Sequence, residues 1–201
     1  MWRKRVARGF VPLVLAALLA GCDGSGKRPE STLPPPPPST MTTTIDVAKV
    51  PATIDVAYVQ AVMNSLDKVT GDAVRVFVAQ RGPNKEWYET FRAVFDEPFF
   101  SSIERDFGSY AANGLKPLRP SPGNPMTTVK RVVDSSPSCI VAEIDRTYSA
   151  LYTTPPGRPE GFIQLRLKKQ DRDVAARNST NWAIVSDVDA QGAQIPEDPC
   201  K

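Results

Sequence analysis

The chain of 201 residues contains no histidine. Histidine is the base in Ser-His and Cys-His catalytic pairs and the commonest protein ligand for transition metals. These reaction classes are therefore excluded, and the remaining residues form no convincing catalytic constellation. We expect a protein that is not an enzyme and that has no cofactor and no metal site.

The sequence also lacks an apolar run long enough to cross a membrane. Residues 10–20 form an uncharged stretch of eleven residues, which rises only about 16 Å as a helix, roughly half of the hydrocarbon core. Four basic residues and no acidic residue precede this stretch. A basic start followed by a short apolar run is typical of an export signal that is later removed.

A strong charge of either sign is missing once the signal is removed. The whole chain has 25 basic and 22 acidic residues, and removal of Arg3, Lys4, Arg5 and Arg8 leaves 21 against 22. The basic isoelectric point therefore belongs to the signal and gives no support for a nucleic-acid partner.

Leu19-Ala20-Gly21-Cys22 closes the apolar run. This stretch resembles the lipobox of bacterial lipoproteins. The resemblance implies cleavage before Cys22, a diacylglyceryl group on its sulfur and an acyl chain such as palmitate on its nitrogen. It further implies attachment through lipid to the extracytoplasmic face of the cell membrane, and Asp23 resembles a signal for inner-membrane retention in double-membraned bacteria. The alternative is an ordinary signal peptide with an incidental cysteine.

Composition divides the chain into four parts. Residues 1–21 are the signal peptide, and residues 22–50 are the lipidated cysteine and a stalk that contains five consecutive prolines at 34–38. Such a stretch buries too little apolar surface to fold alone, and its prolines favour extended polyproline II. Residues 51–190 have the length of one domain, and residues 191–201 are a proline-rich tail.

The first half of the domain shows helical periodicity. Asp55 can cap a helix with apolar positions from Val59 to Leu66, which Thr70-Gly71-Asp72 interrupts. Residues 74–78 fit either a restarted helix or a short strand, and we favour the helix. Asn84 can cap an aromatic third helix, and Asp96 can cap its continuation beyond Pro98.

After a Gly- and Pro-rich stretch at residues 111–125 the apolar period changes from 3.6 to 2. Strands are expected at residues 127–133, 139–152, 161–169 and 181–188, with a polar loop at residues 170–180. The sequence therefore predicts an α+β domain, with N-terminal helices packed on a curved four-stranded antiparallel sheet.

The order of these elements, ending in Asn181-Trp182-Ala183-Ile184-Val185, resembles the NTF2-like or cystatin-like cone fold. The arrangement with the helices ahead of four strands is similar to periplasmic domains of conjugation and type IV secretion scaffold proteins. This fold hosts enzymes, binding modules and assembly proteins alike, so the resemblance implies a fold and leaves the function open.

Two groups of residues are candidates for lining a pocket in such a cone. Trp87, Phe91 and Phe95 share one helical face and are most simply hydrophobic core. The second group is Glu143, Asp145 and Tyr148 on the long strand. Isomerase-type members of the superfamily pair a carboxylate base with a tyrosine donor, but alternation places these carboxylates and the tyrosine on opposite faces.

The segment from Asp187 to Asp198 imitates the start of a calcium loop. Gln191 and Pro196 break the pattern, and a strand stands where a helix is required. A turn followed by a proline-rich tail is the simpler interpretation.

With Cys22 assigned to lipid, Cys139 and Cys200 remain as a pair in an oxidising compartment. We expect a disulfide between them, and the alternative is two free thiols.

These observations favour a lipid-anchored, non-catalytic binding or assembly domain of the cell envelope, with an envelope protein as partner. The alternative is a cone pocket for a small molecule, with carrier or isomerase-like activity. A cone mouth plugged by Trp87, Phe91 and Phe95 would favour the first function. An open pocket lined by Glu143, Asp145 or a buried tyrosine would favour the second.

Overall fold

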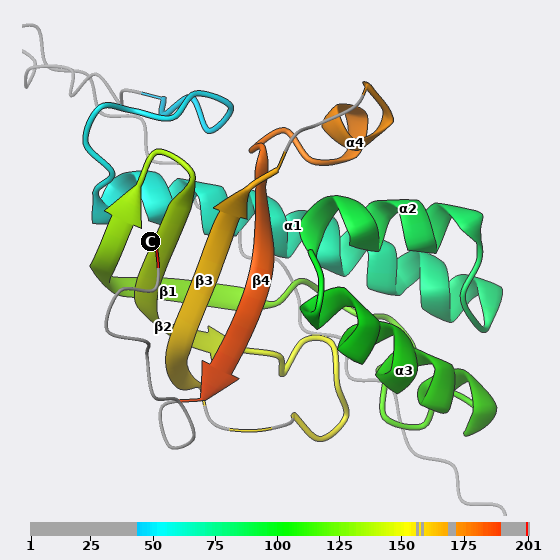
Figure 1. Cartoon of the computed structure of the whole chain (residues 1–201). Coiled ribbons are helices and arrows are strands. Elements are labelled where there is room, and N and C mark those ends of the chain that lie inside the picture. Colours follow the sequence, from blue (N-terminus) through cyan, green and yellow to red (C-terminus); the bar gives the residue numbers. More distant parts are fainter. Residues whose placement is uncertain (1–43, 156, 158, 169–171, 190–199, 201) are drawn as a thin grey trace, which may run out of the picture. The chain divides into compact units, whose positions relative to one another are not determined.

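The computed structural model describes residues 44–155, 157, 159–168, 172–189 and 200 (Figure 1). The chain divides into Met1–Thr42 and Thr43–Lys201, and all described residues belong to the second part. The expected signal peptide, Cys22, the proline run and the tail at residues 191–199 lie outside the described residues.

The longest helix is α1, Val56–Gln80, and Asp55 caps it as expected by accepting a hydrogen bond from Tyr58 N at 2.8 Å. The break expected at Thr70-Gly71-Asp72 is wrong, because the helix continues through all three residues. Thr70 Oγ1 donates to Leu66 O at 2.8 Å within the helix. The helix ends when Arg81 adopts the left-handed conformation, one residue before Gly82.

Two shorter helices follow. Helix α2, Lys85–Val94, begins at Asn84, whose side chain accepts from Trp87 N at 2.8 Å as expected. Helix α3, Phe99–Ala112, begins after Pro98. The expected side-chain cap from Asp96 is wrong for the described structure: the main-chain oxygen of Asp96 accepts from Phe100 N instead.

Four strands form one open antiparallel sheet in the order β1-β2-β3-β4. The strands are β1 Met126–Ser136, β2 Cys139–Thr147, β3 Glu160–Leu167 and β4 Trp182–Asp189. Strand β2 is shorter than expected because the chain turns at Tyr148. The main-chain oxygen of Tyr148 accepts hydrogen bonds from Leu151 N and Tyr152 N. The loop expected between β3 and β4 contains a short helix, α4 Arg172–Arg177.

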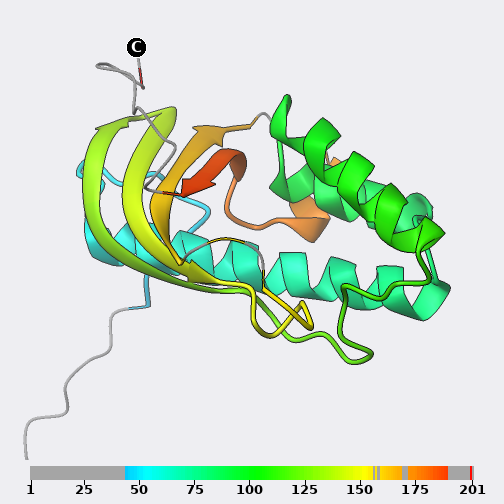
Figure 2. The ribbon, with the colours of Figure 1, turned by 90° about the horizontal axis from the view of Figure 1, so that it is seen from below.

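The sheet is curved and α1 runs along it (Figure 2). Buried side chains of α1 join those of alternate residues on β2 and β3 in one core. Trp182 Nε1 also donates to Tyr58 OH at 2.9 Å, which ties β4 to α1 inside this core. The core-facing residues of the two central strands are Ile140, Ala142, Ile144, Ile163 and Leu165.

Neighbouring elements contact each edge of the sheet at a few positions. Gln60 on α1 donates to Thr127 O and accepts from Val129 N, each at 2.8 Å, along the free edge of β1. At the other edge, Asp96 N donates to Ile184 O at 2.9 Å. Such pairing protects edge strands from association with other chains.

The sulfur atoms of Cys139 and Cys200 lie 2.13 Å apart, which is bonding distance, and these are the two cysteines expected to pair.

The folded part of the chain also reaches back before residue 51. Val47 and Val50 pack against the core, and Asn181 Nδ2 donates to Ala48 O at 3.0 Å. Within the described residues no helix has the length and apolar character that a membrane span requires.

Candidate functional site

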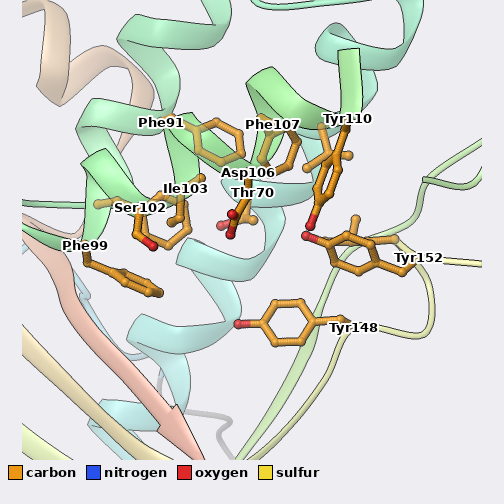
Figure 3. A pocket seen from close by; sticks show the side chains of 13 residues that line it. Thr70, Phe91, Phe99, Ser102, Ile103, Asp106, Phe107, Tyr110, Tyr148 and Tyr152 are labelled. Atoms are coloured by element: carbon orange, nitrogen blue, oxygen red, sulfur yellow. The ribbon is translucent and has the colours of Figure 1, made fainter. Parts of the chain in front are cut away.

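A cavity of about 230 Å³ lies between α1, α2, α3 and the turn after β2. Figure 3 shows the side chains that line it. Most of the lining is aromatic, with four phenylalanines and three tyrosines. The aromatic residues are Phe91, Phe95, Phe99, Phe107, Tyr110, Tyr148 and Tyr152.

Local sequence explains why these rings meet. Phe99, Ile103, Phe107 and Tyr110 are spaced by four, four and three residues, so α3 presents them on one face. The tight turn at residues 148–152 returns Tyr152 beside Tyr148, with ring centroids 6.1 Å apart. The cavity therefore has one helical wall and one wall made by the turn.

The hydroxyl groups of the three tyrosines lie close to other polar groups of the protein. The hydroxyl ends of Tyr110 and Tyr152 point toward one another in Figure 3. Burial raises the pKa of Tyr152, and the neighbouring Tyr110 raises it further. Burial also raises the pKa of Tyr148 well above its ordinary value, so its hydroxyl keeps the proton that it donates to Asp187.

Tyr148 connects the cavity to a buried ion-pair cluster of Arg146, Asp67 and Asp187. Arg146 Nη2 lies 2.7 Å from Asp67 Oδ1, and Nη1 lies 2.8 Å from Asp187 Oδ2. The three side chains are 2%, 5% and 13% exposed. The Arg146 guanidinium also lies over the Tyr148 ring, 5.1 Å from its centroid. This contact holds Tyr148 in place from behind.

A β-bulge places Asp187 on the inner face of the sheet. Ile184 of β4 stands opposite Leu165, but the register shifts between Gln164 and Leu165, so Asp187 stands opposite Ile163. Because Ile163 and Leu165 both face the core, their partners face the core as well. Without the bulge, alternation from Ile184 would direct Asp187 outward.

The structure brings three of the six expected pocket residues to the cavity: Phe91, Phe95 and Tyr148. Trp87 is fully buried behind the wall, where its ring stacks on Phe91 at 4.7 Å. Glu143 and Asp145 instead make partly exposed ion pairs with Arg131 and Lys130, each at 2.6 Å. The alternation of β2 therefore separates these carboxylates from Tyr148.

Sequence reasoning did not identify the ion-pair cluster. Arg146 could have been noticed, because it occupies the apolar side of β2 between Ile144 and Tyr148, where a charged residue needs a buried partner. Asp67 lies on the buried side of α1, between Met63 and Thr70. Asp187 gave no usable signal, because its position depends on the bulge.

The described residues contain no group of three or more His, Cys, Asp or Glu side chains that could hold a metal ion. Asp187, the first residue of the imitated calcium loop, is bound to Arg146 and Tyr148. The part of that loop from residue 190 to residue 198 lies outside the described chain.

Comparisons of the chain with protein-family models, with curated protein sequences and with solved structures find no match.

Proposed function

We propose that this chain is a cell-envelope lipoprotein whose α+β domain binds a small, largely apolar ligand without catalysing a reaction. The observation that carries the proposal is the cavity of about 230 Å³ lined by aromatic rings and tyrosine hydroxyls. Binding sites for small molecules are typically concave and apolar, with a few fixed polar groups. The tyrosine-lined cavity matches that description.

The same cavity favours ligand binding over assembly with a protein. An open pocket with a buried tyrosine is the feature expected of the small-molecule class, and the partly buried Tyr148 and Tyr152 come closest to it. The large exposed apolar side chains of the described residues come from five separate segments and give no argument for a docking face. They are Ile45, Val56, Met126, Leu167 and Val188.

A carrier fits this cavity better than an isomerase-like enzyme. Glu143 and Asp145, the expected bases, belong to ion pairs away from the cavity. The Tyr148 proton is already donated to Asp187, and the raised pKa of Tyr148 opposes its transfer. The lining therefore supplies shape and aromatic surface, which are what a binding protein needs.

We further propose that the domain is a variant of the NTF2-like cone. Two features support this: the helices α1 to α3 precede the four strands, and the antiparallel sheet is curved (Figures 1 and 2).

The lipid anchor is part of the proposal and rests on Leu19-Ala20-Gly21-Cys22. Two or three acyl chains hold a protein on a bilayer far more firmly than one. The stalk would then present the cavity to ligands in the envelope, where a partner protein could deliver or receive them. In detergent phase separation we expect the native chain in the detergent phase and Cys22→Ala in the aqueous phase. Equal partitioning of both would contradict the anchor.

The binding proposal is tested by titrating the full-length chain in nanodiscs with 3,3-dimethyl-1-butanol, a neutral alcohol of seven heavy atoms. Nanodiscs avoid detergent tails, which could enter the cavity. We expect saturable shifts of the methyl NMR signals of Ile103 and Leu151, which line it. Ile103→Trp should fill the cavity and abolish saturation, whereas Met126→Trp, at a position 68% exposed, should not. Weak shifts of the same size in the native chain, Ile103→Trp and Met126→Trp would contradict a specific site.

A further inference from the structure

The charges at the cavity are mostly negative. Of the thirteen residues that line it, one carries a formal charge, and this residue is Asp106 on α3. Behind Tyr148, the single cation Arg146 contacts two carboxylates, Asp67 and Asp187. The cluster therefore retains one unit of negative charge beneath the cavity. An anionic ligand would meet repulsion from both sides.

The aromatic lining favours a cation as well. Rings from α2, α3 and the turn after β2 surround the space, and the negatively polarised face of an aromatic ring attracts a positive charge within about 6 Å of its centroid. The hydroxyl proton of Tyr148 is donated to Asp187. Its hydroxyl oxygen is therefore left with lone pairs, and lone pairs also favour a positive group.

A positive side chain, Arg105, also lies on α3 next to the lining residue Asp106. Its Nη2 lies 3.5 Å from Ser102 Oγ, the limit of a hydrogen bond, and the residue is exposed on α3. Solvent screens a charge in that position. Asp106 is exposed and screened as well, but it lines the cavity whereas Arg105 does not, so the charge of the lining remains negative.

We propose that the ligand is a small organic cation, an ammonium group with alkyl substituents, bound between the tyrosines and phenylalanines of the cavity. This inference rests on the proposed binding function and specifies its ligand class. A space of about 230 Å³ corresponds to roughly seven or eight water molecules by their share of liquid volume. Ligands of similar size, with about seven heavy atoms, fit that space.

Three probes of nearly identical shape test the charge preference. Choline carries a trimethylammonium group, 3,3-dimethyl-1-butanol replaces it with an uncharged tert-butyl group, and 3,3-dimethylbutanoate carries a carboxylate. Affinities for the full-length chain in nanodiscs are measured by NMR titration at one salt concentration. We expect choline to bind about tenfold more tightly than the alcohol, and the carboxylate to bind more weakly than either.

A charge-neutralising variant adds a second test. Asp106→Asn should weaken choline binding by about threefold and leave binding of the alcohol unchanged, because an exposed charge contributes a modest amount. Asp145→Asn makes the same chemical change on the opposite face of the sheet and should alter neither affinity. Because Asp106 is exposed, its replacement by Asn should leave the protein folded. A loss of affinity for choline alone would therefore not be explained by unfolding.

The outcomes separate the two proposals. If the alcohol binds as tightly as choline, or the carboxylate binds best, the cation inference is overturned and the binding function stands. If none of the three probes binds, the binding function fails and the cation inference fails with it. If Asp106→Asn weakens both probes equally, the effect is structural and the assigned role of Asp106 is overturned.

Discussion

Arg146 is the residue that joins the core to the cavity. It is buried, it spans from Asp67 on α1 to Asp187 on β4, and its guanidinium lies against the Tyr148 ring. A buried ion pair is weak evidence for stability, because desolvation opposes the attraction. Removal of one partner is different, since it leaves the other charges buried without compensation.

We therefore expect Arg146→Met to lower the free energy of unfolding by about 3 to 5 kcal/mol. Chemical denaturation of the full-length chain measures the change. Lys130→Met is the matched control, because Lys130 pairs with Asp145 on the exposed side of the sheet and its removal leaves no buried charge. Equal midpoints for the two variants would contradict the importance assigned to the cluster.

The alternation of inward- and outward-facing residues holds along β2 but fails along β4. Alternation along β2 correctly places Glu143 and Asp145 away from Tyr148. The same rule fails for Asp187, because one extra residue in β4 changes the face of every position that follows. A bulge depends on pairing with β3, which the sequence of β4 alone does not contain.

Helix α1 contains a glycine that suggests a break in the sequence but serves a tertiary contact in the structure. Gly71 suggests a break, yet the helix continues, and the loop at residues 122–124 packs directly against this glycine. A Cβ atom at Gly71 would lie 2.7 Å from Gly123 O and 2.9 Å from Asn124 Cα. The glycine therefore permits a close approach of the chain and does not end the helix.

Two glycine substitutions separate these effects. Gly71→Ala should destabilise the protein by about 1 to 3 kcal/mol, because main-chain atoms must move to admit the methyl group. Gly108→Ala, on the exposed face of α3 with open space around it, should stabilise by up to about 1 kcal/mol through helix propensity. Thermal unfolding of both variants checks the opposite signs, and stabilisation by Gly71→Ala would refute the contact argument.

Other elements agree more closely with the prediction from the sequence. Asp55 and Asn84 cap their helices because their side chains accept main-chain N–H bonds locally, within three residues. The strands were predictable where apolar and polar residues alternate, as along β3. The short helix α4 was not predicted, because its six residues are too few to show a helical period.

At the scale of the whole molecule, the disulfide between Cys139 and Cys200 links the start of β2 to the C-terminal end of the chain. The bond spans 61 residues and contributes about 4 kcal/mol in the chain-entropy model. The pairing was predictable by elimination once Cys22 was assigned to lipid. The cavity was less predictable, since its walls come from three helices and a turn whose relative placement the sequence does not state.

The Cys139→Ser, Cys200→Ser double variant should unfold at a markedly lower denaturant concentration than the oxidised protein, and reductant should lower the midpoint of the native protein but not that of the variant. Alkylation of the unreduced, denatured native chain followed by mass spectrometry should find neither cysteine labelled. Two labelled thiols would show that the pair is not oxidised in the protein, and the stabilisation assigned to it would be withdrawn.

A crystal structure of the protein grown with choline would show directly whether this domain holds a small organic cation among the aromatic side chains in Figure 3. We expect density for the trimethylammonium group between Tyr110, Tyr148, Tyr152 and the phenylalanines Phe99 and Phe107 of α3, near Asp106. A cavity filled only by ordered water, with choline absent or bound at another surface, would contradict cation binding in this cavity.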